Sequence, residues 1–420
     1  MGSSQQTSSS GAGQFVQLNS GLSSQMLGNF GGVNREMNIL NAKSMLQDET
    51  LYLGGYAQTG ISWSTANKKI YGLSNSSKSE TVFSLDDVSL SLLGNLNQYA
   101  AVYVQQDMNS IGQSGGNTSP QFNQVYVLLG NNSMPVYGFA GRKDIDFGNF
   151  STVNMFAQPT TRNLFEVNGT TAGIGYNAYG FNVVASAMNG GSNGSTDVYG
   201  GGIWNPYLGY AQRTGNTISN TLNGLYTSSE AQLSNFALNA NYGMNTYGVN
   251  WSLGAGYLNG IWMGQQYAIS GTTVTNGLAA TSKRVGAWDL NAQVGFQGLT
   301  VLAEFVTTAQ NITFTNSRLF NNLLLNGGNG KVDAWDLGTS YGFNAGFIPN
   351  QSVVSFDYSG SKIGSSSPVN VNQYVLGARN EIFPKANVWA GLEYAYQHVT
   401  NIGIGTVNNN NVRLNLTASF

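Results

Sequence analysis

The sequence predicts an all-β chain that closes into a transmembrane antiparallel barrel of about sixteen strands. Three observations support this prediction: charged residues are scarce, aromatic and turn-forming residues are abundant, and apolar and polar residues alternate along most of the chain. Charged residues make up only 9% of the 420 residues, against about 25% in a typical soluble protein. The chain has no apolar run of about 18 residues, so membrane-spanning helices are excluded.

Composition also narrows the classes of function. The 55 Gly, 22 Tyr and 20 Phe, with only 7 Pro, are typical of many strands joined by turns. Cysteine is absent, which excludes disulfides and thiolate metal sites, and a net charge of −2 gives no reason to expect nucleic acid as a partner. We expect no cofactor. The chain starts with a Gly/Ser/Gln stretch, so we expect its export signal to be absent here.

The chain divides into three parts. Residues 1–33 are rich in Gly, Ser and Asn and predict a flexible tail. Residues 34–49 predict a short helix capped by Asn34. Residues 50–420 predict the barrel, because apolar and polar residues alternate there with a period of two.

The last segment shows the alternation clearly. Val412 and Leu414 fall on one face, and Arg413 and Asn415 fall on the other. We count sixteen such segments, which begin near residues 51, 82, 99, 121, 135, 169, 180, 234, 247, 285, 298, 332, 351, 372, 386 and 410. A soluble sandwich, the alternative architecture, would need more charge on its outer faces.

The connections between these segments alternate in length. Short turns are expected near Asn97, Ser133, Gly180, Thr246, Gly298, Ala345 and Lys385. Longer polar segments are expected at 65–81, 108–120, 146–168, 190–233, 260–284, 310–331, 361–371 and 399–409. This layout is typical of bacterial outer-membrane barrels, with short periplasmic turns and long outer loops.

Aromatic residues should form girdles at the two membrane interfaces. With the strand directions above, six of the predicted girdle residues lie near the outer rim and the last lies near the periplasmic rim: Trp63, Trp288, Trp335, Tyr358, Tyr374, Tyr396 and Phe420. The predicted partners are membrane lipid and lipopolysaccharide, and the barrel-assembly machinery through the C-terminal Phe420.

A barrel of this width leaves an aqueous channel. Strand parity predicts the charged side chains that line it: Asp107, Arg142, Asp144, Asp289, Glu304, Asp336, Asp357, Arg379, Glu381, Glu393 and Arg413. Acids outnumber bases by eight to three in this set, which predicts a mild preference for cations. The alternative is that most of them are solvated wall residues or cross-strand ion pairs.

Two long connections are candidates for selectivity. The segment 145–167 is apolar for a loop and is predicted to fold inward and narrow the pore through Phe147, Asn149, Phe150, Gln158, Arg162 and Glu166. The segment 190–233 is a candidate external lid. Enzymatic activity is not expected, because His398 is the single histidine and no metal-ligand cluster is visible.

Two stretches resemble the siderophore porins of Gram-negative outer membranes, the family typified by the legiobactin receptor. The first is NILNAK at 38–43 followed by LGGY at 53–56. The second is GR at 141–142, FGNF at 147–150, QPT at 158–160 and Glu166, within a variant LFEV at 164–167. The resemblance implies a porin-like receptor for a ferric siderophore, without the folded plug and energy-coupling box of larger receptors.

We therefore expect an outer-membrane channel for solute uptake, with a ferric siderophore as a candidate solute. Two alternatives stay open: a membrane anchor whose outer loops bind host or phage partners, and a general diffusion porin with a mild cation preference. Both single-chain and trimeric assemblies are compatible with such a barrel.

Overall fold

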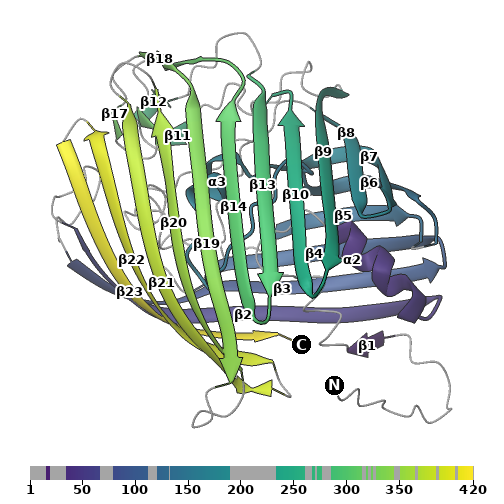
Figure 1. Ribbon diagram of the computed structural model, residues 1–420. Helices are drawn as coiled ribbons and strands as arrows, with labels where there is room; N and C mark the ends of the chain where they lie inside the picture. The colour runs from purple at the N-terminus through teal and green to yellow at the C-terminus, as the bar shows by residue number, and fades with distance from the viewer. Residues whose placement is uncertain are drawn as a thin grey trace.

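The structure is a computed structural model that describes residues 16–18, 35–66, 79–111, 121–131, 133–189, 233–260, 267–269, 272–276, 285–314, 318–319, 323–324, 328–344, 351–364, 368–384, 387–402 and 405–419. Its main feature is one sheet of seventeen strands, sixteen of which form a closed antiparallel barrel (Figure 1). The barrel strands are β2 Thr50–Ala66, β3 Ser79–Asn97, β4 Ala100–Ile111, β5 Gln121–Leu129, β6 Val136–Asp144, β7 Asn168–Ala178, β8 Phe181–Asn189, β9 Leu233–Thr246, β10 Val249–Leu258, β13 Ala287–Phe296, β14 Leu299–Thr308, β19 Val332–Asn344, β20 Gln351–Ile363, β21 Val369–Phe383, β22 Val388–Ile402 and β23 Gly405–Ser419.

The barrel closes between its first and last strands. Strand β23 pairs with β2, from Tyr56 opposite Ser419 to Ala66 opposite Asn409. The predicted barrel is therefore confirmed. The seventeenth strand, β1 (Val16–Leu18), pairs in parallel with the start of β2. The rest of the predicted tail, 1–33, lies outside the described residues.

Three hairpins at one end of the barrel have two-residue turns, formed by Tyr179-Gly180, Tyr247-Gly248 and Gln297-Gly298. Both residues of each turn have positive φ, between 44° and 87°. This backbone matches the right-handed twist of the flanking strands, and glycine adopts it without a steric penalty. The sequence signal for these short turns is the glycine in the second position.

Longer connections lie at the opposite end and contain small elements of their own. These are β11 (Tyr267–Ile269), β12 (Thr272–Asn276), β15 (Ile312–Phe314), β16 (Arg318–Leu319), β17 (Leu323–Leu324) and β18 (Gly328–Gly330). The expected lid at 190–233 lies almost entirely outside the described residues. The last four strands are longer than expected: β20 and β21 extend into the loop predicted at 361–371, and β22 and β23 into the one at 399–409.

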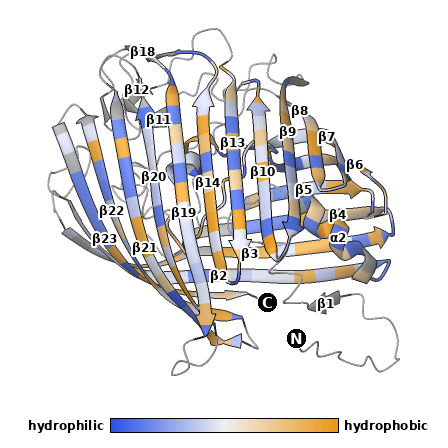
Figure 2. Cartoon of the chain, viewed as in Figure 1, coloured by the Kyte–Doolittle hydropathy of each residue, from blue (hydrophilic) through white to orange (hydrophobic). Residues whose placement is uncertain are grey.

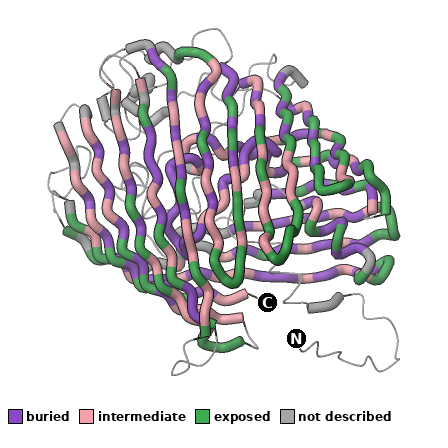
Figure 3. Tube along the Cα trace, viewed as in Figure 1, coloured by how far each residue is buried: buried purple, intermediate pink, exposed green. Residues whose placement is uncertain are grey.

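Side chains alternate between two environments along the strands. On one face, Leu290, Phe305 and Leu414 are between 42% and 60% exposed. On the other, their chain neighbours Asp289, Glu304 and Arg413 are no more than 6% exposed, because other parts of the chain cover them inside the barrel. Figure 2 shows this alternation in the hydropathy of the residues along the strands, and Figure 3 shows it in their burial. The outward apolar face suits lipid.

A short helix, α2 (Arg35–Ala42), continues as a 3₁₀ turn, η1 (Lys43–Met45), and packs on the inner face of the barrel (Figure 1). Ile39, Leu40 and Ala42 are buried against inward side chains of β2 to β6 and β8. Burying a large apolar side chain contributes about 1.5–3 kcal/mol, which explains why such a short helix is held there. None of the helices in the described residues is long and apolar enough to cross a membrane.

Candidate pore constriction

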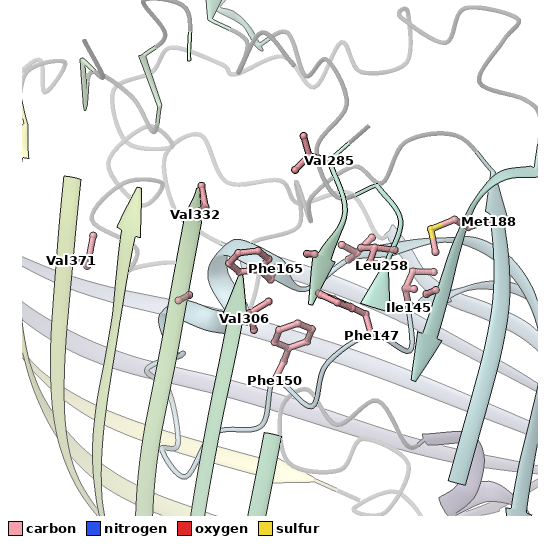
Figure 4. Close-up of a cluster of buried hydrophobic side chains, with 14 of the residues drawn as sticks. Ile145, Phe147, Phe150, Phe165, Met188, Leu258, Val285, Val306, Val332 and Val371 are labelled. Atoms are coloured by element: carbon pink, nitrogen blue, oxygen red, sulfur yellow. The ribbon is translucent and has the colours of Figure 1, made fainter. Parts of the chain in front are cut away.

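The segment 145–167 connects β6 to β7, and we call it the constriction loop. Its apolar side chains Ile145, Phe147, Phe150, Phe165 and Val167 are all buried. They pack with inward residues of the barrel wall in one cluster, which includes Met188, Leu258, Ala287, Val306 and Ala334 (Figure 4). A loop outside the barrel would leave these side chains in water, so burial explains why an apolar loop folds inward.

One carboxylate holds the first part of the loop. Backbone N–H groups of Asn149 and Phe150 both donate to Glu304 Oε1, each at 2.8 Å. Glu304 lies on β14 and is buried. Hydrogen bonds to an ionised acceptor are the stronger kind, so this carboxylate anchors the loop to the wall.

A second carboxylate holds the middle of the loop. The backbone N–H of Met155 donates to Glu393 Oε1 at 2.5 Å, that of Phe156 to the same atom at 2.8 Å, and that of Ala157 to Glu393 Oε2 at 2.9 Å. Glu393 lies on β22, and β19, β20 and β21 separate it in the sheet from β14. The loop is therefore fixed at two separate places on the barrel wall.

Further polar contacts join the loop to the wall. Gln58 Nε2 donates to the Met155 carbonyl at 3.3 Å, and Gln373 Nε2 donates to the Gln158 carbonyl at 2.8 Å. The loop also contains a short helix, α3 (Thr160–Phe165), whose Thr160 hydroxyl donates to the Gly360 carbonyl at 2.6 Å. These contacts leave the loop little freedom to move as a whole.

A glycine lets the loop come close to the wall. At Gly256 on β10, a Cβ atom would lie only 1.6 Å from the Phe147 carbonyl oxygen. Real Cβ atoms are never found so close, so only glycine fits under the loop at this point.

The polar side of the loop is less buried. Arg162 Nε donates to Glu166 Oε2 at 2.8 Å, and Arg162 donates through another nitrogen to Gln158 Oε1, also at 2.8 Å. Both charged side chains are about one-sixth exposed, at 15% and 17%. The Asn149 side chain accepts a hydrogen bond from the Ser151 hydroxyl. The loop therefore carries its charged and amide groups on one side, and its buried apolar side chains point away from that side.

The structure brings most of the predicted pore-lining charges to the inner face. Asp107, Asp289, Asp336, Asp357 and Arg413 are buried there beside Glu304 and Glu393. Arg413 lies over the Phe156 ring, 3.7 Å from its centroid, and donates to the Ser62 hydroxyl at 2.6 Å. Arg379 and Glu381 are half-buried on the inner side of β21. The constriction loop therefore covers part of the charged wall.

The predicted inward position of Arg142 is wrong. Arg142 is exposed and pairs across strands with exposed Val125 on one side and exposed Thr170 on the other, whereas the neighbouring Lys143 is buried. Asp144 is half-buried and accepts hydrogen bonds from Gln124 and Asn168.

The error has a physical reason. Three charged residues follow one another in β6, so parity has to be set by the aromatic residues Tyr137 and Phe139. If aromatic residues are assumed to face lipid, Tyr137 and Phe139 are predicted to point outward and Arg142 is predicted to point inward. In the structure they face inward, because helix α2 covers them.

A charge cluster that the sequence analysis did not anticipate links helix α2 to the constriction loop. Lys143 Nζ lies 3.0 Å from Glu36 Oε1 on α2 and 2.5 Å from Asp146 Oδ2 in the loop. We call these three residues the charge latch. Burial raises the pKa of the Asp146 carboxyl to about 7, a shift that the Lys143 ammonium opposes and the Glu36 carboxylate reinforces.

Six of the seven predicted girdle residues belong to the described part of the chain, and they lie on the outward face of the barrel. Trp63 and Trp288 are about half exposed, and Trp288 packs on Tyr257 with ring centroids 4.4 Å apart. Tyr374 stacks between two partners, at 4.9 Å from Tyr358 and 6.3 Å from Tyr396. Trp335 is partly exposed on β19, and Phe420 lies outside the described residues.

Comparison with known sequences yields a partial relative. No protein-family model matches the chain. The UPF0422 protein lpl2888 of Legionella pneumophila (strain Lens) is 26% identical over 225 residues. This match covers 53% of the chain and 38% of the relative, so it spans less than half the length of that curated protein.

Solved structures with the same fold are outer-membrane porins and channels. OmpF of Salmonella typhi, solved with daunomycin, superposes with a TM-score of 0.55 at 11% identity over 88% of this chain and 97% of that one. The anion-selective porin of Comamonas acidovorans gives 0.52 at 11% identity (88% and 99% covered), and the channel DcaP of Acinetobacter baumannii gives 0.52 at 14% (88% and 97%). The chain therefore has the fold of an outer-membrane porin.

Proposed function

We propose that this protein is a passive, porin-like channel for the uptake of small solutes across the outer membrane, with ferric siderophores as the solute class. The observation that carries the proposal is the constriction loop, which is folded into the barrel and hydrogen-bonded to its wall through Glu304 and Glu393. A barrel of sixteen strands is too wide for its own side chains to fill. A fixed loop inside it narrows an aqueous path.

The solute class rests on the resemblance to siderophore porins. Its matching residues FGNF at 147–150 and QPT at 158–160 lie in the constriction loop, the element that narrows the pore in this proposal. Passage is passive in this proposal, without energy coupling, because the narrowing element is a connection of the barrel that is bonded to the wall at several points.

The charge of the inner face supports a preference for cations. Asp289, Asp336 and Asp357 lie on neighbouring strands of the inner face with Glu304, and their summed field would attract cations into the pore. The preference is expected to be mild, since Arg379 and Arg413 lie on the same inner face.

Planar-bilayer recording of the purified protein tests the channel. We expect a steady conductance with a reversal potential displaced toward that of the cation in a salt gradient. Asp336→Asn should reduce this displacement. The matched control is Asp333→Asn, which removes the same charge from the outward side of the same strand. A silent barrel would refute the channel, and equal shifts in both variants would refute the role of the lumen charges.

A growth assay tests the solute class. An iron-limited strain that lacks its own siderophore receptors should grow on a ferric siderophore when it expresses this chain. Conductance without siderophore-dependent growth would leave a general diffusion porin and would refute the siderophore proposal.

A further inference from the structure

We propose that helix α2 is a second restriction of the same pore, with its asparagine face exposed to the passing solute. This inference rests on the proposed channel function and adds a second specificity-determining element to it. Size selection would then depend on α2 as well as on the constriction loop.

The first argument is the position of α2. Ile39, Leu40 and Ala42 are at most 2% exposed. Their partners include Leu93, Tyr103, Tyr126, Leu128 and Phe139, which lie on the inner faces of β3 to β6. An apolar helix face that packs on the inner wall places the helix within the lumen. The channel must therefore pass beside it.

The second argument is that both ends of the helical segment are fastened. At the N-terminal end, Glu36 is bound to the buried Lys143, which also binds Asp146 of the constriction loop. At the C-terminal end, Lys43 Nζ donates to the Asn97 carbonyl in a tight turn at 2.9 Å. A segment tied at both ends stays in the lumen as part of its wall.

The third argument is the exposed face of the helix. Asn38 and Asn41 are exposed and three residues apart, so they lie on the same side of the helix, opposite the buried Leu40. Amide side chains both donate and accept hydrogen bonds. This face suits a polar solute rich in hydrogen-bonding groups, and it carries no charge that would repel either sign of ion.

Cysteine accessibility provides the test, since the chain has no cysteine of its own. Asn41→Cys is placed on the exposed face, and Ala42→Cys, next to it on the buried face, is the matched control. Each purified variant is inserted in a planar bilayer and treated with water-soluble methanethiosulfonates, one cationic and one anionic. Mass spectrometry of the same samples measures the extent of modification.

We expect Asn41→Cys to be modified and to lose conductance in a single step, with reversal potentials that shift in opposite directions for the two reagents. Ala42→Cys should stay unmodified. Asn38→Cys repeats the measurement one turn earlier. Modification of Asn41→Cys without a change in conductance, or its failure to react, would overturn the inference. Silent channels in the unsubstituted protein would instead refute the proposed function itself.

Discussion

Replacing Glu393 with glutamine should release the middle of the constriction loop. The carboxylate accepts three backbone N–H groups, two on Oε1 and one on Oε2. In Glu393→Gln an amide nitrogen takes the place of one oxygen, so the N–H of Ala157 would face another donor. A buried donor left without a partner costs about 1–3 kcal/mol.

The net effect combines this loss with two smaller terms. The two remaining bonds lose their charge assistance, which weakens each by about 1 kcal/mol, whereas a neutral amide is easier to bury than a carboxylate. These two smaller terms offset each other in part, so the net free-energy cost of the substitution stays at about 1–3 kcal/mol. Because every 1.4 kcal/mol is tenfold, the released loop should become about 5 to 150 times more populated.

Single-channel recording measures this population directly. We expect Glu393→Gln to show more open-channel noise and more frequent substates than the unsubstituted protein. Asp107→Asn serves as the control, because it removes the same charge from the inner wall at a carboxylate that accepts hydrogen bonds from Gln105. Equal noise in Glu393→Gln and the unsubstituted protein would refute the view that this carboxylate holds the loop.

Three further substitutions probe the packing, each by urea unfolding of the folded barrel in lipid vesicles. Gly256→Ala should lower the free energy of unfolding by about 1–3 kcal/mol, because the new methyl group meets the Phe147 carbonyl; an unchanged value would show that the loop does not lie there. Phe150→Ala should cost about 3–5 kcal/mol through the cavity it leaves, and a loss under 1 kcal/mol would mean that the ring is not buried. Tyr374→Ala should cost about 0.5–1.5 kcal/mol beyond the area it buries, and Tyr374→Phe, which keeps the stack on Tyr358, should largely preserve stability.

Alternation along the chain was sufficient to predict the strands and the closed barrel. Each strand has one face in lipid and one toward the lumen, so the period of two is a direct consequence of the environment. The alternation of apolar and polar residues is ambiguous in the parts of the strands that extend beyond the membrane. There β22 and β23 continue as far as Ile402 opposite Gly405, because strand pairing does not depend on an apolar outer face.

The inner face could be predicted only where it carries charged side chains. Asp289, Glu304 and Arg413 were placed correctly by parity, because a charge cannot face lipid. Tyr137 and Phe139 are predicted on the wrong face by parity, because an apolar face of helix α2 covers the inner wall near them and makes the inward environment apolar. Apolar residues on both sides of a strand remove the contrast that parity depends on.

The sequence by itself determined the strands, the tight glycine turns and an apolar connection at 145–167 that folds inward. Only the tertiary structure decided what holds this connection, because Glu304 and Glu393 bind backbone N–H groups, which every residue except proline carries and no sequence pattern marks. It also decided the position of α2, whose latch joins Glu36 to Lys143, residues far apart in the chain. Contacts of this kind depend on which parts of the chain face each other across the lumen. Only the closed barrel determines this arrangement.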